Sequence, residues 1–308
     1  MAARRLNGGR RRFLAPGDAI GVVATGFAVR PEKLDAGLAR LHRWGYRVVT
    51  GAHLRDRDGY LAGSDRGRGD DLAAMLRNTE PSAIWFARGG YGTARLLDRV
   101  PWAALRRDPK LLIGYSDLTA LFNAVVSRTA SVCLYGPVVA ELGDRASWHA
   151  PSLDALSRGR PYRLRLRAGQ VLAPGRAAGT LVGGNLTVLT HLLGTRYAPD
   201  FRGRVLFLEE TGEETYRVDR MLTHLRQSGA LDRVAAVLVG AIDVPPRRRF
   251  PPDRSLAAVV EERLAPLGVP VLTGIPAGHL RAKRTIPLGA RAVIDTDELA
   301  IRFEPRRA

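Results

Sequence analysis

The sequence predicts two domains, a doubly wound parallel α/β domain followed by a smaller α+β domain of swivelling type. The chain has 308 residues, 45% of them hydrophobic, which is more length than one core usually serves. Between 18 and 142, short apolar runs rich in β-formers alternate with segments of helical period. That alternation indicates parallel strands joined by crossover helices. Strands dominate the end of the second half, which favours α+β there.

The first half is expected to contain five strands buried on both faces, because short β-rich apolar runs alternate with helical segments there. These runs lie at 19–25, 46–51, 82–87, 111–114 and 131–136. Helical segments lie between them. In the segment 31–45, for example, Leu34, Leu38 and Leu41 recur at helical spacing. We therefore assign residues 1–142 to the first domain.

Residues 143–178 differ in character, with three prolines, several glycines and the alternating stretch "YRLRLR". They are interpreted as a linker or an edge hairpin. The second domain, 179–308, resumes with a strand at 204–210, a helix at 216–229, a strand at 234–240 and a helix at 255–265, and ends in further strands up to 303.

The net charge of +18 raises the question of nucleic-acid binding, because Lys and Arg supply most non-specific affinity for phosphates. The arginines are scattered, however, with clusters only at 10–12, 247–249 and 306–307, and no nucleic-acid motif accompanies them. A solvated basic surface is the favoured interpretation, attraction to an anionic small substrate or cell-wall fragment comes second, and nucleic-acid binding comes third.

The single cysteine, Cys133, excludes an intrachain disulfide and a multi-cysteine metal site. It lies in an apolar run, so we expect a buried, inert thiol. A membrane-spanning helix needs about 20 consecutive apolar residues, and no stretch of the sequence is close to that length. The basic N-terminus lacks the apolar region of a signal peptide. A soluble cytoplasmic protein without a membrane partner is expected.

The stretch "LLIGYSDLTAL" places one hydroxyl, Ser116, between a buried strand and a helix. A nucleophile elbow has this arrangement, because the N–H groups and helix dipole that follow can stabilise an oxyanion. The pattern G-x-S-x-G is only half met, since Leu118 stands at its last position. The alternative is that Ser116 is simply the helix N-cap.

A nucleophilic serine needs a base and a group that orients the base. Among six histidines, His279 stands out because it follows a short strand in a loop rich in Gly and Pro, where α/β proteins place their sites. Glu209 and Glu210 end an apolar strand, and Glu209 can be held there away from water. A third element, "RGGYG" at 88–92, fits an oxyanion hole, a phosphate site or a plain tight turn.

Taken together, these segments resemble the serine L,D-carboxypeptidase family, which trims muropeptides and includes the microcin-immunity peptidases. Seven ordered motifs carry the resemblance: "GYLAGSD" (59–65), "RGGYG" (88–92), "LIGYSDLTAL" (112–121), "YGPV" (135–138), "LVGGNLTVL" (181–189), "FLEETGEETYRVDRML" (207–222) and "GHLRAKRTIPLG" (278–289). They extend over nearly the whole chain.

The resemblance implies a flavodoxin-like first domain, a swivelling-type second domain, a site between them and a homodimer. It also implies that Ser116 is the nucleophile, Glu209 the acid and His279 the general base. Backbone N–H groups of Asp117 and of the pair Gly89 and Gly90 would form the oxyanion hole. Whether Glu209 or Glu210 faces His279, and which glycine donates, stay open.

The expected reaction is hydrolysis of the L,D bond between meso-diaminopimelate and terminal D-alanine in cytoplasmic muropeptides, with no metal and no cofactor. Arg88, Arg281, Lys283 and Arg284 are candidates for binding the substrate carboxylate, on sequence proximity alone. A first alternative is a microcin-immunity-type amidase acting on peptidyl-nucleotide antibiotics, for which Trp148 is the residue to examine. A second is a non-catalytic basic protein that binds nucleic acid.

Overall fold

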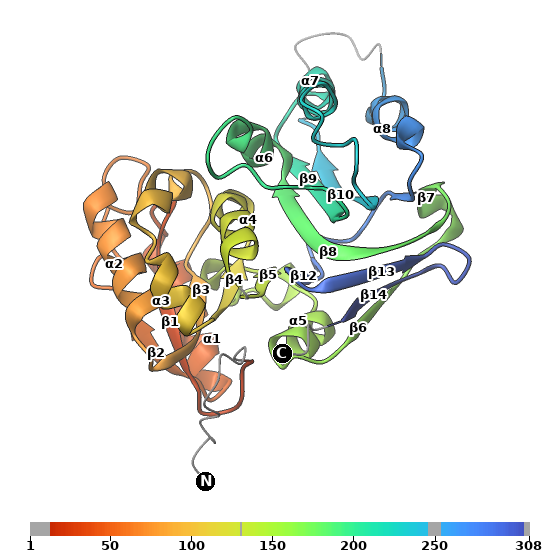
Figure 1. The fold of residues 1–308 in the computed structure, drawn as a ribbon. Helices are drawn as coiled ribbons and strands as arrows, with labels where there is room; N and C mark the ends of the chain where they lie inside the picture. Colours follow the sequence, from red (N-terminus) through yellow and green to blue (C-terminus); the bar gives the residue numbers. More distant parts are fainter. Residues whose placement is uncertain (1–12, 130, 246–253, 305–308) are drawn as a thin grey trace.

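The computed structural model describes residues 13–129, 131–245 and 254–304. Two β-sheets with their helices lie side by side (Figure 1). The arginine clusters predicted at 10–12, 247–249 and 306–307 lie outside the described residues. None of the described helices is long and apolar enough to cross a membrane.

The first sheet has the predicted doubly wound form. It contains β1 (Ala19–Val23), β2 (Arg47–Thr50), β3 (Pro81–Phe86), β4 (Leu111–Gly114), β5 (Cys133–Tyr135) and β12 (Ile286–Leu288). The first five strands run parallel in the order β2-β1-β3-β4-β5, the flavodoxin-like order. Strands β1 and β4 are buried at every position, which explains their uninterrupted apolar sequence. The prediction of burial on both faces is wrong for β2, because it is the edge strand of the sheet and its residues are exposed or half-buried.

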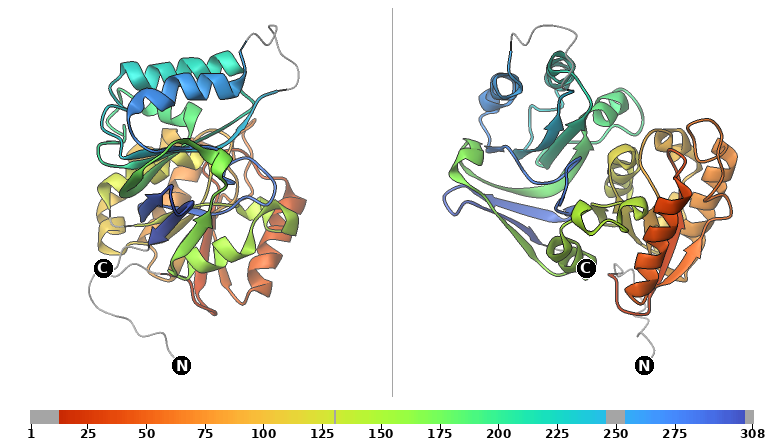
Figure 2. Two further views of the ribbon diagram at one scale, coloured as in Figure 1. Left: turned by 90° about the vertical axis from the view of Figure 1, so that its right-hand side faces the viewer. Right: turned by 180° about the vertical axis from the view of Figure 1, so that it is seen from behind.

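Helices cover both faces of this sheet. They are α1 (Pro31–Arg43), α2 (Asp65–Arg77), α3 (Trp102–Arg107) and α4 (Thr119–Arg128). Helix α1 lies on the face opposite α2 and α3, as the front and back views show (Figures 1 and 2). The predicted fold class is confirmed by this arrangement and by the mixed second sheet.

The second sheet has eight strands in the order β6-β14-β13-β8-β9-β10-β11-β7. Its members are β6 (Tyr162–Arg165), β7 (Val171–Ala173), β8 (Arg176–Asn185), β9 (Val205–Thr211), β10 (Ala236–Asp243), β11 (Val271–Leu272), β13 (Arg291–Asp295) and β14 (Ala300–Glu304). Strands β8 to β11 run parallel and the others antiparallel. The accompanying helices are α6 (Leu186–Leu192), α7 (Thr215–Gln227) and α8 (Leu256–Leu264).

Residues 143–178 hold helix α5 (Ala150–Ser157), β6, β7 and the beginning of β8. Strands β6 and β7 do not pair with each other as a hairpin would; they pair with β14 and β11 at opposite edges of the second sheet. The division at 142 and 179 therefore stays a prediction from sequence.

The two sheets are joined in two ways. Strand β12, from the second half, pairs antiparallel with β5 and extends the first sheet. Helix α4 also docks on β8: the Asn123 amide exchanges two hydrogen bonds with the backbone of Gly183, at 2.9 and 3.0 Å, and Asn185 N–H donates to Thr119 Oγ1 at 2.9 Å. This docking brings the end of β4 next to the end of β9.

Candidate active site

Ser116 follows β4 at a strained turn. Its φ of 68° lies in the left-handed region, which non-glycine residues seldom adopt. A short 3-10 turn, Ser116–Leu118, separates it from α4, so Leu118 and not Ser116 precedes that helix. The N-cap alternative is therefore wrong. Backbone strain of this kind is typical of a nucleophile elbow, which exposes the serine side chain at the carboxyl end of the sheet.

The glycine loop at 88–92 passes directly against this turn. A Cβ placed on Gly89 would lie 2.9 Å from Ser116 Cβ and 3.3 Å from Ser116 Oγ, so a side chain there would collide with the serine. The buried Asp117 carboxylate accepts the Thr93 N–H at 2.8 Å and so ties the loop to the turn. Burial raises the pKa of Asp117, although the hydrogen bonds from Thr93 oppose the shift.

Glu209 lies near the end of β9 with no exposed surface. Its Oε2 is 2.7 Å from His279 Nδ1 and accepts the His279 backbone N–H at 3.1 Å. Gly278 makes this approach feasible, because a Cβ there would lie 2.6 Å from the same oxygen. A buried carboxylate on Nδ1 can fix the imidazole tautomer and leave Nε2 as the basic nitrogen.

The neighbouring Glu210 faces a different environment. Its carboxylate accepts hydrogen bonds from Asn185 Nδ2 at 2.9 Å and from the backbone N–H groups of Thr187 and Thr211 at 2.7 and 2.8 Å. Of the two adjacent glutamates, it is therefore Glu209 that contacts His279.

A residue that the sequence analysis did not single out links these groups. The hydroxyl of Tyr135, at the end of β5, donates to Glu209 Oε1 at 2.7 Å and accepts the Ser116 backbone N–H at 3.0 Å. Burial raises the pKa of Tyr135 well above its usual range, so it remains a neutral donor. Tyr135 lies in the motif "YGPV", which is the only signal the sequence offered.

Ser116 and His279 line one cleft, of about 570 Å³, at the carboxyl ends of the strands. The glycine pair Gly89 and Gly90 and the predicted cation Arg88 also line it. Two further cations, Arg30 and Lys33, were missed by the sequence analysis, although they lie at the start of α1, where the connection that follows the carboxyl end of β1 enters the helix. Within the described ranges, no group of three His, Cys, Asp or Glu side chains is placed to hold a metal ion.

The other three predicted cations do not line this cleft. Lys283 is buried and donates to Glu141 Oε1 at 2.6 Å. Arg281 is exposed, with Asp144 3.8 Å away. Arg284 contacts His149 Nε2 at 3.3 Å on the side of the α5 segment. The structure therefore brings together Arg88, but not these three, with the serine and the histidine.

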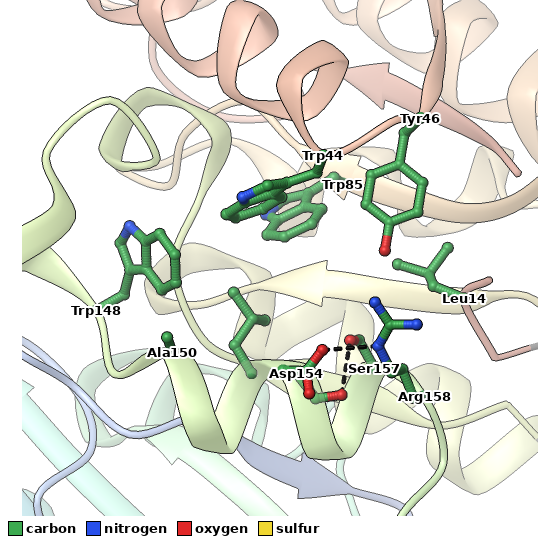
Figure 3. Close-up of a pocket in the computed structure, with 10 residues that line it drawn as sticks. Leu14, Trp44, Tyr46, Trp85, Trp148, Ala150, Asp154, Ser157 and Arg158 are labelled. Atoms are coloured by element: carbon green, nitrogen blue, oxygen red, sulfur yellow. Dashed lines mark hydrogen bonds and ion pairs between the residues drawn. The ribbon is translucent and has the colours of Figure 1, made fainter. Parts of the chain in front are cut away.

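Trp148 also lies away from the cleft. It lines a separate pocket of about 270 Å³ together with Trp44 and Trp85 (Figure 3). The Trp148 and Trp44 rings meet edge to face, with centroids 5.2 Å apart. Aromatic rings on the cleft itself come instead from Phe27 and Tyr115.

Comparison with known proteins finds relatives that match nearly the whole chain. Residues 20–136 match the LD-carboxypeptidase N-terminal domain, and residues 178–294 match the LD-carboxypeptidase C-terminal domain. The probable murein peptide carboxypeptidase of Bacillus subtilis is 37% identical over 294 residues, which cover 93% of this chain and 92% of that protein. The microcin C7 self-immunity protein of Escherichia coli is 26% identical over 326 residues, covering 92% of each chain.

Among solved structures, the muramoyltetrapeptide carboxypeptidase from Oxalobacter formigenes superposes with a TM-score of 0.83 at 28% identity, over 94% of this chain and 100% of that one. Both halves of the chain and its overall fold thus agree with the resemblance seen in the motifs, and the chain belongs to the LD-carboxypeptidase family.

Proposed function

We propose that this protein is a serine peptidase that removes terminal D-alanine from murein tetrapeptides by cleaving the L,D bond after meso-diaminopimelate. The observation that carries the proposal is the shared cleft: a serine on a strained left-handed turn and a histidine bonded to a buried carboxylate both line it. The 37% identical Bacillus subtilis relative, named as a murein peptide carboxypeptidase, supports the substrate class.

In the proposed reaction, His279 Nε2 takes the proton of Ser116 as the serine oxygen attacks the carbonyl of the scissile bond. Glu209 holds Nδ1 and stabilises the imidazolium that forms. Backbone N–H groups of Asp117 and of Gly89 or Gly90 stabilise the oxyanion. The imidazolium then protonates the leaving amine of D-alanine. Water, deprotonated by His279, hydrolyses the acyl-enzyme and regenerates the serine.

The charge of the cleft suits an acidic peptide. Arg30, Lys33 and Arg88 line it, and Arg88 also donates to the Ala28 carbonyl at 2.7 Å, which orients its guanidinium. The carboxylate at the cleft, Glu141, is already paired with Lys283. We propose that the three lining cations bind the carboxylates of the substrate, since charge-assisted bonds of this type are the stronger ones.

The test is incubation of purified protein with muropeptides that carry tri-, tetra- and pentapeptides, followed by mass spectrometry. Tetrapeptide should give tripeptide and D-alanine, while tripeptide should remain intact. Ser116→Ala should lower turnover by about 10³-fold or more. Ser228→Ala, on the surface at the end of α7, is the matched control and should retain full turnover. Undiminished cleavage by Ser116→Ala would rule the mechanism out.

The microcin-type alternative is tested in the same assay with a peptidyl-nucleotide substrate. It predicts aromatic residues in the pocket loops that stack on the nucleobase; Trp148 lines the other pocket, while Phe27 and Tyr115 line the cleft. The murein assignment is preferred because the relative named as a murein peptide carboxypeptidase is 37% identical and the microcin self-immunity protein 26% identical. Faster cleavage of the peptidyl-nucleotide than of the tetrapeptide would reverse this preference.

We also propose that the protein acts in the cytoplasm and as a homodimer. Light scattering coupled to gel filtration measures the oligomeric state, with a dimer of 33.5 kDa chains expected. Fractionation of cells followed by immunodetection measures the location. A stable monomer, or enrichment in the extracellular fraction, would contradict the respective part.

A further inference from the structure

A cluster of three polar side chains, two of which line the cleft, has no role in the reaction just described. Glu141 Oε1 accepts two hydrogen bonds, one from the Tyr115 hydroxyl at 2.8 Å and one from Lys283 Nζ at 2.6 Å. Its Oε2 accepts the backbone N–H of Val138 at 3.2 Å. Lys283 is only 3% exposed, so its ammonium has exchanged water for the carboxylate.

The cluster touches the imidazole that carries out the proposed proton transfers. The Tyr115 ring packs against His279 with ring centroids 4.8 Å apart, and Lys283 Nζ lies 4.8 Å from the centre of the same ring. Tyr115 is thus held on one side by the Glu141–Lys283 pair and supports the histidine on the other.

The pair also bridges the two halves of the chain. Lys283 and His279 belong to one loop of the second half, whereas Tyr115 and Glu141 belong to the first. Two backbone hydrogen bonds hold the same loop nearby. His149 N–H donates to the Lys283 carbonyl at 2.9 Å, and Ala282 N–H donates to the Ala146 carbonyl at 2.8 Å.

The choice of lysine is itself informative. Only three of the 48 basic residues are lysines, and two of these, Lys110 and Lys283, are buried. Lysine carries a compact charge on a flexible stem, and Lys283 reaches the Glu141 carboxylate from a buried position. The buried ammonium therefore belongs to an internal ion pair.

We propose that the Glu141–Lys283 ion pair positions the His279 loop against Ser116, and that Lys283 is a positioning residue and not a substrate-binding one. This inference rests on the proposed function. The ammonium is neutralised by the Glu141 carboxylate, so it has little to offer a substrate carboxylate. Removing it leaves the half-buried Glu141 without its cationic partner, and the loop shifts as the carboxylate seeks solvent or a new partner.

The proposal predicts which kinetic constant changes. A histidine displaced by as little as about 1 Å lowers the rate of the chemical step by up to about 10²-fold, whereas substrate contacts are untouched. Lys283→Met should therefore reduce kcat by about tenfold to a hundredfold and leave KM within about threefold. If Lys283 bound the substrate instead, KM would rise while kcat stayed near the wild-type value.

The experiment compares two readouts on the full chain. The first is the rate at which a fluorophosphonate probe labels Ser116, which needs no murein peptide; the second is kcat and KM on the tetrapeptide. Lys110→Met is the matched control, because it removes the other buried lysine, which pairs with Asp108 at 2.9 Å at the opposite end of β4 from Ser116. It should leave both readouts unchanged per folded molecule.

Slower labelling and a lower kcat at constant KM in Lys283→Met support the proposal; a raised KM at constant kcat, or no change, overturns it. If that variant does not fold, Glu141→Gln decides in the same two readouts, since it keeps the acceptor oxygen but removes the charge. If the wild type labels but does not cleave tetrapeptide, the proposed substrate has failed, and the labelling rates still decide the role of the pair.

Discussion

Replacing Glu209 by Gln tests the proposed role of the buried carboxylate with little change in shape. The side chain accepts the Tyr135 hydroxyl at 2.7 Å, His279 Nδ1 at 2.7 Å and the His279 N–H at 3.1 Å. Glutamine keeps one accepting oxygen but replaces the other by an NH₂ donor. With the oxygen toward His279, the charge is lost; with the NH₂ group toward His279, the tautomer is also reversed.

The lower bound of the effect comes from the lost charge alone. Two unit charges 4 Å apart attract by about 4 kcal/mol at an effective dielectric constant of about 20. Each 1.36 kcal/mol corresponds to about a factor of ten in rate, so losing the carboxylate next to the imidazolium predicts a kcat lower by about 10³-fold. A reversed tautomer would increase the loss to about 10⁴-fold.

Glu210→Gln is the matched control, because Glu210 is also buried but bonds to Asn185 and backbone N–H groups away from His279. Both variants lose charge-assisted hydrogen bonds, worth about 1.5–3 kcal/mol each, and both should melt at lower temperature. Only Glu209→Gln should lose turnover of tetrapeptide per folded molecule. A Glu209→Gln kcat within tenfold of wild type, or an equal loss in Glu210→Gln, would refute the reasoning.

Three further variants or reagents probe single features. Gly89→Ala places a Cβ 2.9 Å from Ser116 Cβ, so it should reduce kcat by about 10²-fold and lower the melting temperature by a few degrees; full activity would contradict the close approach. Burial and the nearby Arg284 lower the pKa of His149, whose Nδ1 accepts a backbone N–H at the start of α5. The folded state therefore favours the neutral imidazole. The contribution of His149 to stability is complete above the pKa of histidine in the unfolded chain, about 6.5, and declines as the pH falls below that value. His149→Asn should flatten the fall in melting temperature below about pH 6.5, and an unchanged slope would count against this assignment. Burial raises the pKa of Cys133, so thiol reagents should modify it only after unfolding, and rapid labelling of the native protein would disprove its burial.

Much of the fold follows from local patterns in the sequence. The strands expected at 46–51 and 82–87 are β2 and β3, and the helix expected at 216–229 is α7, each within two residues of its predicted bounds. Apolar patterning suffices for β3 because a central parallel strand covered on both faces is continuously apolar, and for α7 because a surface helix has one apolar stripe. Strand β2 lies at the sheet edge and is only partly buried, so its apolar pair Val48 and Val49 carries its signal.

The pairing of strands distant in sequence could not be predicted in this way. Strand β12 belongs to the second half by sequence but completes the first sheet beside β5. A three-residue apolar strand has no signal that selects its partner, since register and neighbour depend on the edge that is left uncovered.

The features of the candidate site also divide into those that the sequence determines and those that depend on the tertiary structure. The sequence by itself determined which residue types stand at the carboxyl ends of buried strands, namely Ser116 after a strand of the first half and the glutamates 209–210 at the end of a strand of the second half. Only the tertiary structure decided between the glutamates. Successive side chains on a strand point to opposite faces of the sheet. Because both faces of β9 are buried, its sequence does not indicate which of the two glutamates lies on the face next to His279. The same holds for Lys283: the charge is evident from the sequence, but its partner, 142 residues away, depends on how the two sheets dock.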